Sequence, residues 1–160
     1  MKLLQWNIWY QEDIRNILKI LKQIDADIIC IQELTMGDPE HNTGIDTFQF
    51  LKENLSMEGF FKPSHEDPLN TFGNAIFSRY PIRLAQAKNI KDAEEEIKNF
   101  SQQARVYIEA EIDTPNAILS VGTTHTSYTD RFMETKEKEV ETDELLNILK
   151  TKSSKLFFYR

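Results

Sequence analysis

Hydrophobic residues along the chain follow two alternating periodicities, one typical of strands and one typical of helices. Residues 2–8 read as a short strand, and from Glu12 to Ile24 the apolar side chains fall on one helical face. Residues 27–33, with the sequence DIICIQE, form a nearly continuous apolar run, which is typical of a strand buried on both faces. A strand, a helix and a strand within the first 33 residues predict a βαβ unit with parallel strands and a right-handed crossover.

The rest of the chain predicts a second helix, a series of strands and a long late helix. A loop rich in Gly, Asp, Pro and Asn covers 34–47. The expected elements that follow are a short helix with Phe48, Leu51 and Leu55, strands at 59–63, 72–78, 82–90, 105–112 and 117–124, a helix at 131–150, and the start of a strand at 155–159. The strand 105–112 alternates, so Val106, Ile108, Ala110 and Ile112 should share one face.

Two polar stretches are predicted to lie on the surface. The acidic segment 92–99 is expected to be a surface excursion, and the middle of the late helix, KEKEVETDE, is almost wholly polar. We interpret this charge run as a solvated helix face.

Length and composition limit the classes of protein that fit. A chain of 160 residues is one domain's worth, 1–160, and it can bury roughly 70% of its unfolded surface. It has no apolar run long enough to span a bilayer and no signal-peptide pattern at its start. The single cysteine, Cys30, lies in an apolar strand and is expected to be a buried thiol. These features favour a cytoplasmic protein without a membrane span.

The formal net charge of −7 argues against a protein that holds nucleic acid mainly by attraction to phosphates. It leaves open an enzyme that acts on phosphates through a bound cation, because acidic residues recruit the metal and the metal faces the phosphate.

Three polar residues stand at predicted strand ends. Asn7 lies near the end of the first strand, Glu33 ends the second, and His125 ends the strand of the hairpin. Ligands of α/β sheets collect outside the carboxyl ends of the strands, and carboxylate and amide oxygens suit Mg²⁺ or Mn²⁺. The alternatives are a solvated or capping glutamate, a turn-forming asparagine and a surface histidine with satisfied hydrogen bonds.

Several other chemistries find no support in the sequence. No role is assigned to His41 and His65, which lie in predicted loops. The spacing of histidines and the lone cysteine fit no zinc motif, and the Gly-rich phosphate loops and the GxSxG nucleophile elbow do not occur.

Taken together, several segments resemble the endonuclease/exonuclease/phosphatase family, which has the DNase-I-like fold. The resemblance rests on a strand ending in Asn, a strand ending in Gln-Glu, a Gly-x-Ala strand before Pro-Ile, an Arg that opens the next strand and a strand ending in His. Here these are LLQWNIW, ADIICIQEL, GNAIFSRYPI at 73–82, Gln103-Ala104-Arg105 and VGTTHTS at 121–127. Each motif alone is weak, but their order along the chain is specific.

The resemblance implies a metal-dependent phosphoesterase that cleaves a phosphodiester or phosphomonoester and is a nuclease in some relatives. By that analogy Glu33 and Asn7 lie at a Mg²⁺ or Mn²⁺ ion, and His125 contacts the phosphate. Asn74 and Arg105 would be substrate contacts, although Arg105 could equally be a structural ion-pair residue. The implied fold is α/β, with a mixed β-sheet and flanking helices, as in the first half of a DNase-I-like four-layer α/β sandwich.

The chain also departs from the family. The Gly-Asp-x-Asn and Ser-Asp-His strings expected of the second half do not occur. The alternative function is therefore a non-catalytic fragment, truncated or split, that needs a partner half. In this picture the one sheet would expose apolar side chains such as Leu4, Ile29 and Ile76, which would make the chain poorly soluble or drive self-association through that face. We also expect the chain alone to be catalytically incompetent.

Overall fold

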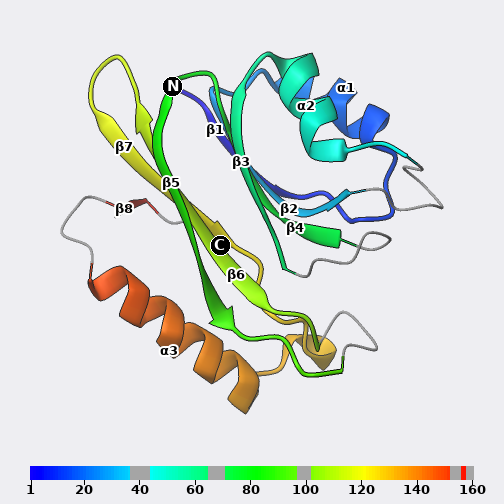
Figure 1. Cartoon of the computed structure of the whole chain (residues 1–160), viewed down its shortest axis with the longest axis vertical. Helices are drawn as coiled ribbons and strands as arrows, with labels where there is room; N and C mark the ends of the chain where they lie inside the picture. The colour runs from blue at the N-terminus through cyan, green and yellow to red at the C-terminus, as the bar shows by residue number, and fades with distance from the viewer. Residues whose placement is uncertain (37–43, 65–70, 97–101, 152–155, 158–160) are drawn as a thin grey trace.

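The computed structural model describes residues 1–36, 44–64, 71–96, 102–151 and 156–157 (Figure 1). Its elements, in chain order, are β1 (Leu3–Asn7), α1 (Ile14–Ile24), β2 (Ile28–Met36), α2 (Thr47–Leu55), β3 (Glu58–Pro63), β4 (Thr71–Ser78), β5 (Ile82–Lys91), β6 (Arg105–Asp113), β7 (Ile118–Thr124), the 3₁₀ turn η2 (Asp130–Phe132), α3 (Lys136–Lys150) and β8 (Leu156–Phe157). Predicted elements and observed ones agree closely. Two elements differ from their predicted bounds. β2 continues to Met36 into the predicted loop 34–47, and α3 begins at Lys136 instead of at residue 131.

The predicted βαβ unit is confirmed. β1 pairs in parallel with β2, from Leu3 beside Ile28 to Asn7 beside Gln32. Between them, α1 begins at Asp13, whose side chain accepts a hydrogen bond from the Arg15 amide and so caps the helix. Because the two strands run in parallel, their carboxyl ends lie side by side at one edge of the sheet.

The eight strands form two four-stranded sheets, with the orders β1-β2-β4-β3 and β5-β6-β7-β8. The second sheet packs on the first, so the expectation of one sheet with an uncovered apolar face is wrong. Ile76 faces the second sheet, and Ile29 faces the helices of the first. Both side chains are buried, and Leu4 is partly buried. The face on which we expected self-association is therefore covered by the chain itself.

The helices and the two sheets stack in four layers (Figure 1). Three clusters of buried apolar side chains hold these layers together. One joins α1 and α2 to the first sheet, and another fills the space between the sheets and includes the predicted face of β6. The third, with Ile90, Tyr107 and Ile148, lies where α3 covers the second sheet. A Cβ at Gly122 would lie 2.3 Å from the Tyr107 hydroxyl, so the glycine permits this ring to cross β7.

The central strand β2 is buried on both faces, as its apolar run predicts. Ile29 and Ile31 point to the helical layer, whereas Ile28 and Cys30 point between the sheets. Cys30 is a free, buried thiol, and burial raises its pKa to about 12. It therefore behaves as a small apolar side chain and not as a nucleophile.

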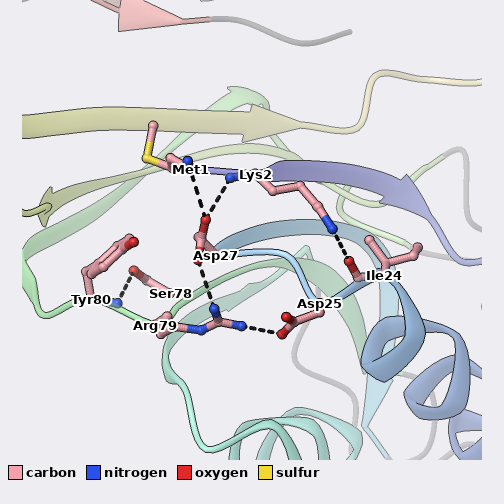
Figure 2. A network of polar contacts seen from close by, with 8 residues as sticks. All are labelled: Met1, Lys2, Ile24, Asp25, Asp27, Ser78, Arg79 and Tyr80. Carbon is pink, nitrogen blue, oxygen red and sulfur yellow. Dashed lines mark hydrogen bonds and ion pairs between the residues drawn. The ribbon is translucent and has the colours of Figure 1, made fainter.

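A polar network closes the amino ends of β1 and β2 (Figure 2). The Asp27 carboxylate accepts a hydrogen bond from the Lys2 amide at 2.7 Å and pairs with the Arg79 guanidinium at 3.0 Å. Arg79 also reaches Asp25 at 2.5 Å, and the Lys2 ammonium donates to the Ile24 carbonyl. These contacts tie β1, the end of α1 and the end of β4 together at the edge opposite to Asn7.

The described part of the chain holds no helix that is long and apolar enough to cross a membrane. His41 and His65 lie outside the described residues, as do residues 97–99 of the predicted acidic surface segment 92–99. The residues 92–96 of that segment are exposed, as predicted.

The packing of the two sheets predicts the effect of shortening Ile76. This side chain is 0% exposed between the sheets, so Ile76→Ala should lower the free energy of unfolding by about 2–5 kcal/mol. Leu84→Ala is the control, because Leu84 is 52% exposed on β5 and should change stability by no more than about 0.5 kcal/mol. Urea denaturation measures both. Similar small losses in the two variants would contradict the buried interface.

Candidate functional site

Asn7, Glu33 and His125 meet at the carboxyl ends of their strands, as the sequence predicts. The Asn7 Nδ2 donates to Glu33 Oε1 at 2.9 Å. The Nε2 of His125 lies 3.4 Å from Asn7 Nδ2 and 3.5 Å from Glu33 Oε1. β1 and β2 bring the first two residues from one sheet, and β7 brings the histidine from the other. The placement of His125 on the same side as Glu33 and Asn7 is confirmed.

A β-bulge sets the direction of Glu33. Between the pairs Ile31–Ala75 and Leu34–Gly73, two residues of β2 oppose one residue of β4. Glu33 itself has φ +60°, in the left-handed region that glutamate seldom adopts. Such backbone costs of order 1–2 kcal/mol, and the paired strands on both sides hold it in place. The bulge places Glu33 at the strand edge beside Asn7 and His125.

The turn after β1 fixes the oxygen atoms of this site. The Trp9 amide donates to Asn7 Oδ1 at 3.1 Å, and the Tyr10 amide donates to Glu33 Oε2 at 3.2 Å. The Ile8 amide donates to the Gln32 carbonyl and continues the pairing of β1 with β2. Trp9 has φ +58°, so this turn also holds a bulky residue in the left-handed region. Backbone groups thus orient both Asn7 and Glu33.

The environment of His125 favours the neutral imidazole. Burial lowers its pKa below the ordinary value, the Arg105 charge lowers it further, and the Glu33 and Glu141 carboxylates act in the opposite direction. Its Nδ1 atom is buried and has no hydrogen-bond partner among the described residues. Nε2 faces Asn7 and Glu33, so the ring presents one nitrogen to the site.

Glu33 and Asn7 have the donor chemistry for a hydrated hard cation. The Glu33 carboxylate accepts one hydrogen bond on each oxygen, which leaves further lone pairs on both, and Asn7 Oδ1 adds a neutral oxygen. The described residues contain no group of three or more His, Cys, Asp or Glu side chains suited to a metal. One carboxylate and one amide fit Mg²⁺, which keeps several waters, better than a metal that needs a full protein cage.

A buried amide crosses between the sheets directly behind the site. Gln32 donates from Nε2 to Thr123 Oγ1 at 2.6 Å and accepts from Gln5 Nε2 at 3.0 Å. Gln32 precedes Glu33 on β2, and Thr123 is two residues before His125 on β7. This contact therefore ties together the two strands that carry Glu33 and His125. The sequence signal for it is a glutamine inside an otherwise apolar strand.

Asn74 and Arg105 do not join the trio. Asn74 is 2% exposed and donates to the Val106 carbonyl at 2.7 Å, so it links β4 to β6. Arg105 is 4% exposed, and its Nε donates to Ser127 Oγ at 3.1 Å. Burial lowers the Arg105 pKa, and the charges of Glu141, Glu137 and Glu33 act in the opposite direction. The structural ion-pair alternative for Arg105 stays a prediction, as does a role of either residue in binding substrate.

Behind Arg105, a buried polar cluster anchors α3 to the segment that follows His125. Glu141 is 0% exposed and accepts from the Ser127 amide at 2.9 Å and from its hydroxyl at 2.5 Å. Glu137 also accepts from Ser127 Oγ and pairs with Lys91. The hydrogen bond from Lys91 is the main reason why the pKa of Glu137 is lowered. The prediction that the middle of this helix is solvated is thus wrong at Glu141.

The charge run hides Glu141 in the sequence, because one buried acid among many exposed ones leaves no periodic signal. Its partner, a buried arginine, stands more than thirty residues away on another element. Burial lowers the pKa of Arg105, and the nearby Glu141 carboxylate raises it. Both effects follow from the packing of α3 on β5 and β6.

Comparison with known proteins identifies similar chains. A family model described as the endonuclease/exonuclease/phosphatase family matches residues 4–151. No curated protein matches the chain in sequence.

Solved structures share the fold at low identity. An endonuclease/exonuclease/phosphatase from Beutenbergia cavernae DSM 12333 is 17% identical, with a TM-score of 0.69 over 94% of this chain and 42% of that one. D. rerio TDP2 complexed with single strand DNA product is 16% identical, with a TM-score of 0.66 over 94% and 54%. A mannosyl-6-phosphatase from Bacteroides thetaiotaomicron VPI-5482 is 11% identical, with a TM-score of 0.67 over 94% and 59%. The chain thus spans about half the length of these proteins.

The buried cluster under His125 predicts a large effect of neutralising Glu141. Glu141→Gln removes the carboxylate that faces Ser127 and the Arg105 charge, so it should lower the free energy of unfolding by about 3–5 kcal/mol. Glu144→Gln, on the exposed face of the same helix, should cost no more than about 0.5 kcal/mol. Chemical denaturation of both variants decides the matter, and equal stability would show that Glu141 is solvated.

Proposed function

Because this chain belongs to the endonuclease/exonuclease/phosphatase family, we propose that its site serves the hydrolysis of a phosphate ester with the help of Mg²⁺ or Mn²⁺. The observation that carries the proposal is the meeting of Asn7, Glu33 and His125 at one edge of the sandwich. The oxygens of Glu33 and Asn7 suit a cation, and the neighbouring imidazole of His125 suits a phosphate beside it.

Each residue has a distinct role in this proposal. Glu33 and Asn7 hold the metal, and the Tyr10 and Trp9 amides keep their oxygens in place. When bound, the metal polarises a phosphoryl oxygen and stabilises the charge that develops on the leaving oxygen. His125, whose pKa is lowered by burial, offers a ring nitrogen to a phosphate oxygen or to the leaving group. Water attacks in line, and no covalent intermediate is needed.

The substrate class is a phosphodiester or a phosphomonoester. Among proteins of the same fold, D. rerio TDP2 binds a single strand DNA product in its complex, and the protein from Bacteroides thetaiotaomicron is a mannosyl-6-phosphatase. The net charge of −7 favours a substrate that is recognised at one phosphate over a duplex held along its backbone. Asn74 and Arg105 are candidate substrate contacts as well, and both are buried. A free, buried Cys30 is consistent with a cytoplasmic location.

A second candidate function is a fragment that binds metal and phosphate but needs a partner half to turn over. Three observations favour it for this polypeptide. The chain spans about half the length of the solved proteins of its fold. Its 160 residues contain no Gly-Asp-x-Asn and no Ser-Asp-His string. The buried Nδ1 of His125 finds no hydrogen-bond partner in the described ranges, as in a site that further groups complete.

The metal site predicts a specific loss on changing Glu33. Glu33→Gln keeps the shape of the side chain but removes its charge, so the affinity for Mg²⁺ or Mn²⁺ should fall by about tenfold or more. Glu95→Gln, at an exposed position of the acidic segment, controls for the general loss of a negative charge. Calorimetric titration of wild type and both variants measures this. Equal affinity in wild type and Glu33→Gln would remove Glu33 from the metal site.

The two candidate functions differ in what the chain does alone. We expect the purified 160-residue protein to hydrolyse a generic phosphodiester or abasic DNA at near the background rate with Mg²⁺ present. No group that would activate the attacking water is identified among the described residues, and general acid–base assistance contributes typically about 10²–10⁴-fold. Metal-dependent turnover that Glu33→Gln abolishes would overturn this expectation and support a complete hydrolase.

A further inference from the structure

Trp9 carries a large, exposed aromatic side chain and lies in the turn that follows Asn7. It is 59% exposed, although a single indole can bury more apolar area than almost any other side chain. Its neighbours in sequence are the buried Ile8 and the half-buried Tyr10. The indole therefore points away from the core that its neighbours join.

Backbone contacts fix the place of Trp9 in the turn beside the site. Trp9 follows Asn7 by two residues, so their Cα atoms lie within about 7 Å of each other. The Trp9 amide donates to Asn7 Oδ1, and its carbonyl accepts from the Glu12 amide at 2.9 Å. The next amide, of Tyr10, donates to Glu33. The turn that orients the two proposed metal ligands thus also carries the indole.

The backbone of Trp9 is unusual in its own right. Its φ of +58° lies in the left-handed region, where glycine and asparagine are common and bulky residues are rare. Unfavourable backbone of this kind clusters at ligand-binding sites, where the surrounding structure enforces it. The chain therefore keeps a tryptophan at a position that disfavours it and leaves its ring in solvent.

From these observations we infer that Trp9 is a specificity-determining residue, whose indole stacks on the base of a nucleotide while the phosphate lies at Asn7, Glu33 and His125. The inference rests on the proposed function, since it needs a phosphate at that site. Base–aromatic stacking does not depend on positive charge, which suits a chain with a net charge of −7. The substrate class is then a nucleotide or the end of a single strand.

The test compares phosphate esters with and without a base. We would titrate the full chain, with Mg²⁺ present, with glycerol 2-phosphate, glucose 6-phosphate and thymidine monophosphate. The indole N–H signal of Trp9 in NMR spectra, assigned with Trp9→Phe, reports on the ring, and His125 reports on the phosphate. Trp6, which is half-buried in β1, serves as an internal reference.

We expect thymidine monophosphate to bind more tightly than both other esters and to shift the Trp9 indole signal. Trp9→Ala should weaken its binding by roughly five-fold to a hundred-fold and weaken the binding of glycerol 2-phosphate much less. Trp9→Phe should retain most of the preference, because it keeps an aromatic face. Trp9→Leu should lose the preference for the nucleotide, because leucine is large but has no aromatic face on which a base can stack.

Three results would overturn the inference while the proposed function stands. In the first, all three esters bind at His125 with equal affinity. In the second, Trp9→Ala weakens the binding of glucose 6-phosphate as much as that of the nucleotide. In the third, the Trp9 signal changes with protein concentration and not with nucleotide. The last would make Trp9 part of an interface between copies of the chain. If glycerol 2-phosphate causes no Mg²⁺-dependent shift at His125, the proposed function fails, and this inference fails with it.

Discussion

The packing of one sheet on the other is the interaction on which the rest of this structure depends. Ile28, Cys30 and Ile76 of the first sheet meet the alternating face of β6 in a buried apolar layer. Removing that apolar area from water stabilises the arrangement by roughly 25 cal/mol per Å² buried. The same layer fixes where β7 ends relative to β1 and β2. His125 can approach Glu33 only because the two sheets are held in this register.

Buried polar contacts add to the apolar layer in fixing the positions of the strands that carry the site. The Gln32–Thr123 hydrogen bond crosses between the sheets directly behind the site, and the Ser127–Glu141 contact secures the segment that leaves β7. Buried polar groups of this kind are costly when they lack a partner, so each pair tolerates little displacement. The site is thus supported on both sides by contacts that favour a single geometry, and the strained φ of Glu33 persists within that frame.

Local patterns in the sequence predict the elements well, and contacts between distant segments are what they miss. The βαβ unit, the alternation of β6 and the positions of Asn7, Glu33 and His125 at strand ends all follow from periodicity and from the rule that ligands gather at carboxyl ends. The second sheet does not follow, because a strand pattern does not reveal which sheet a strand joins. Glu141 is hidden in a charge run, and the left-handed turn at Trp9 lacks the glycine or asparagine that marks such turns.

The central claim is that Asn7, Glu33 and His125 form one metal and phosphate site, and paramagnetic Mn²⁺ tests it most directly. Small additions of Mn²⁺ to the isotopically labelled chain broaden the NMR signals of nearby groups. The account predicts broadening centred on Asn7, Tyr10, Glu33 and His125, which excess Mg²⁺ reverses. Broadening centred on the acidic residues of α3 or on the Asp25–Asp27 end of the sheet, with the signals of the trio unchanged, would contradict it.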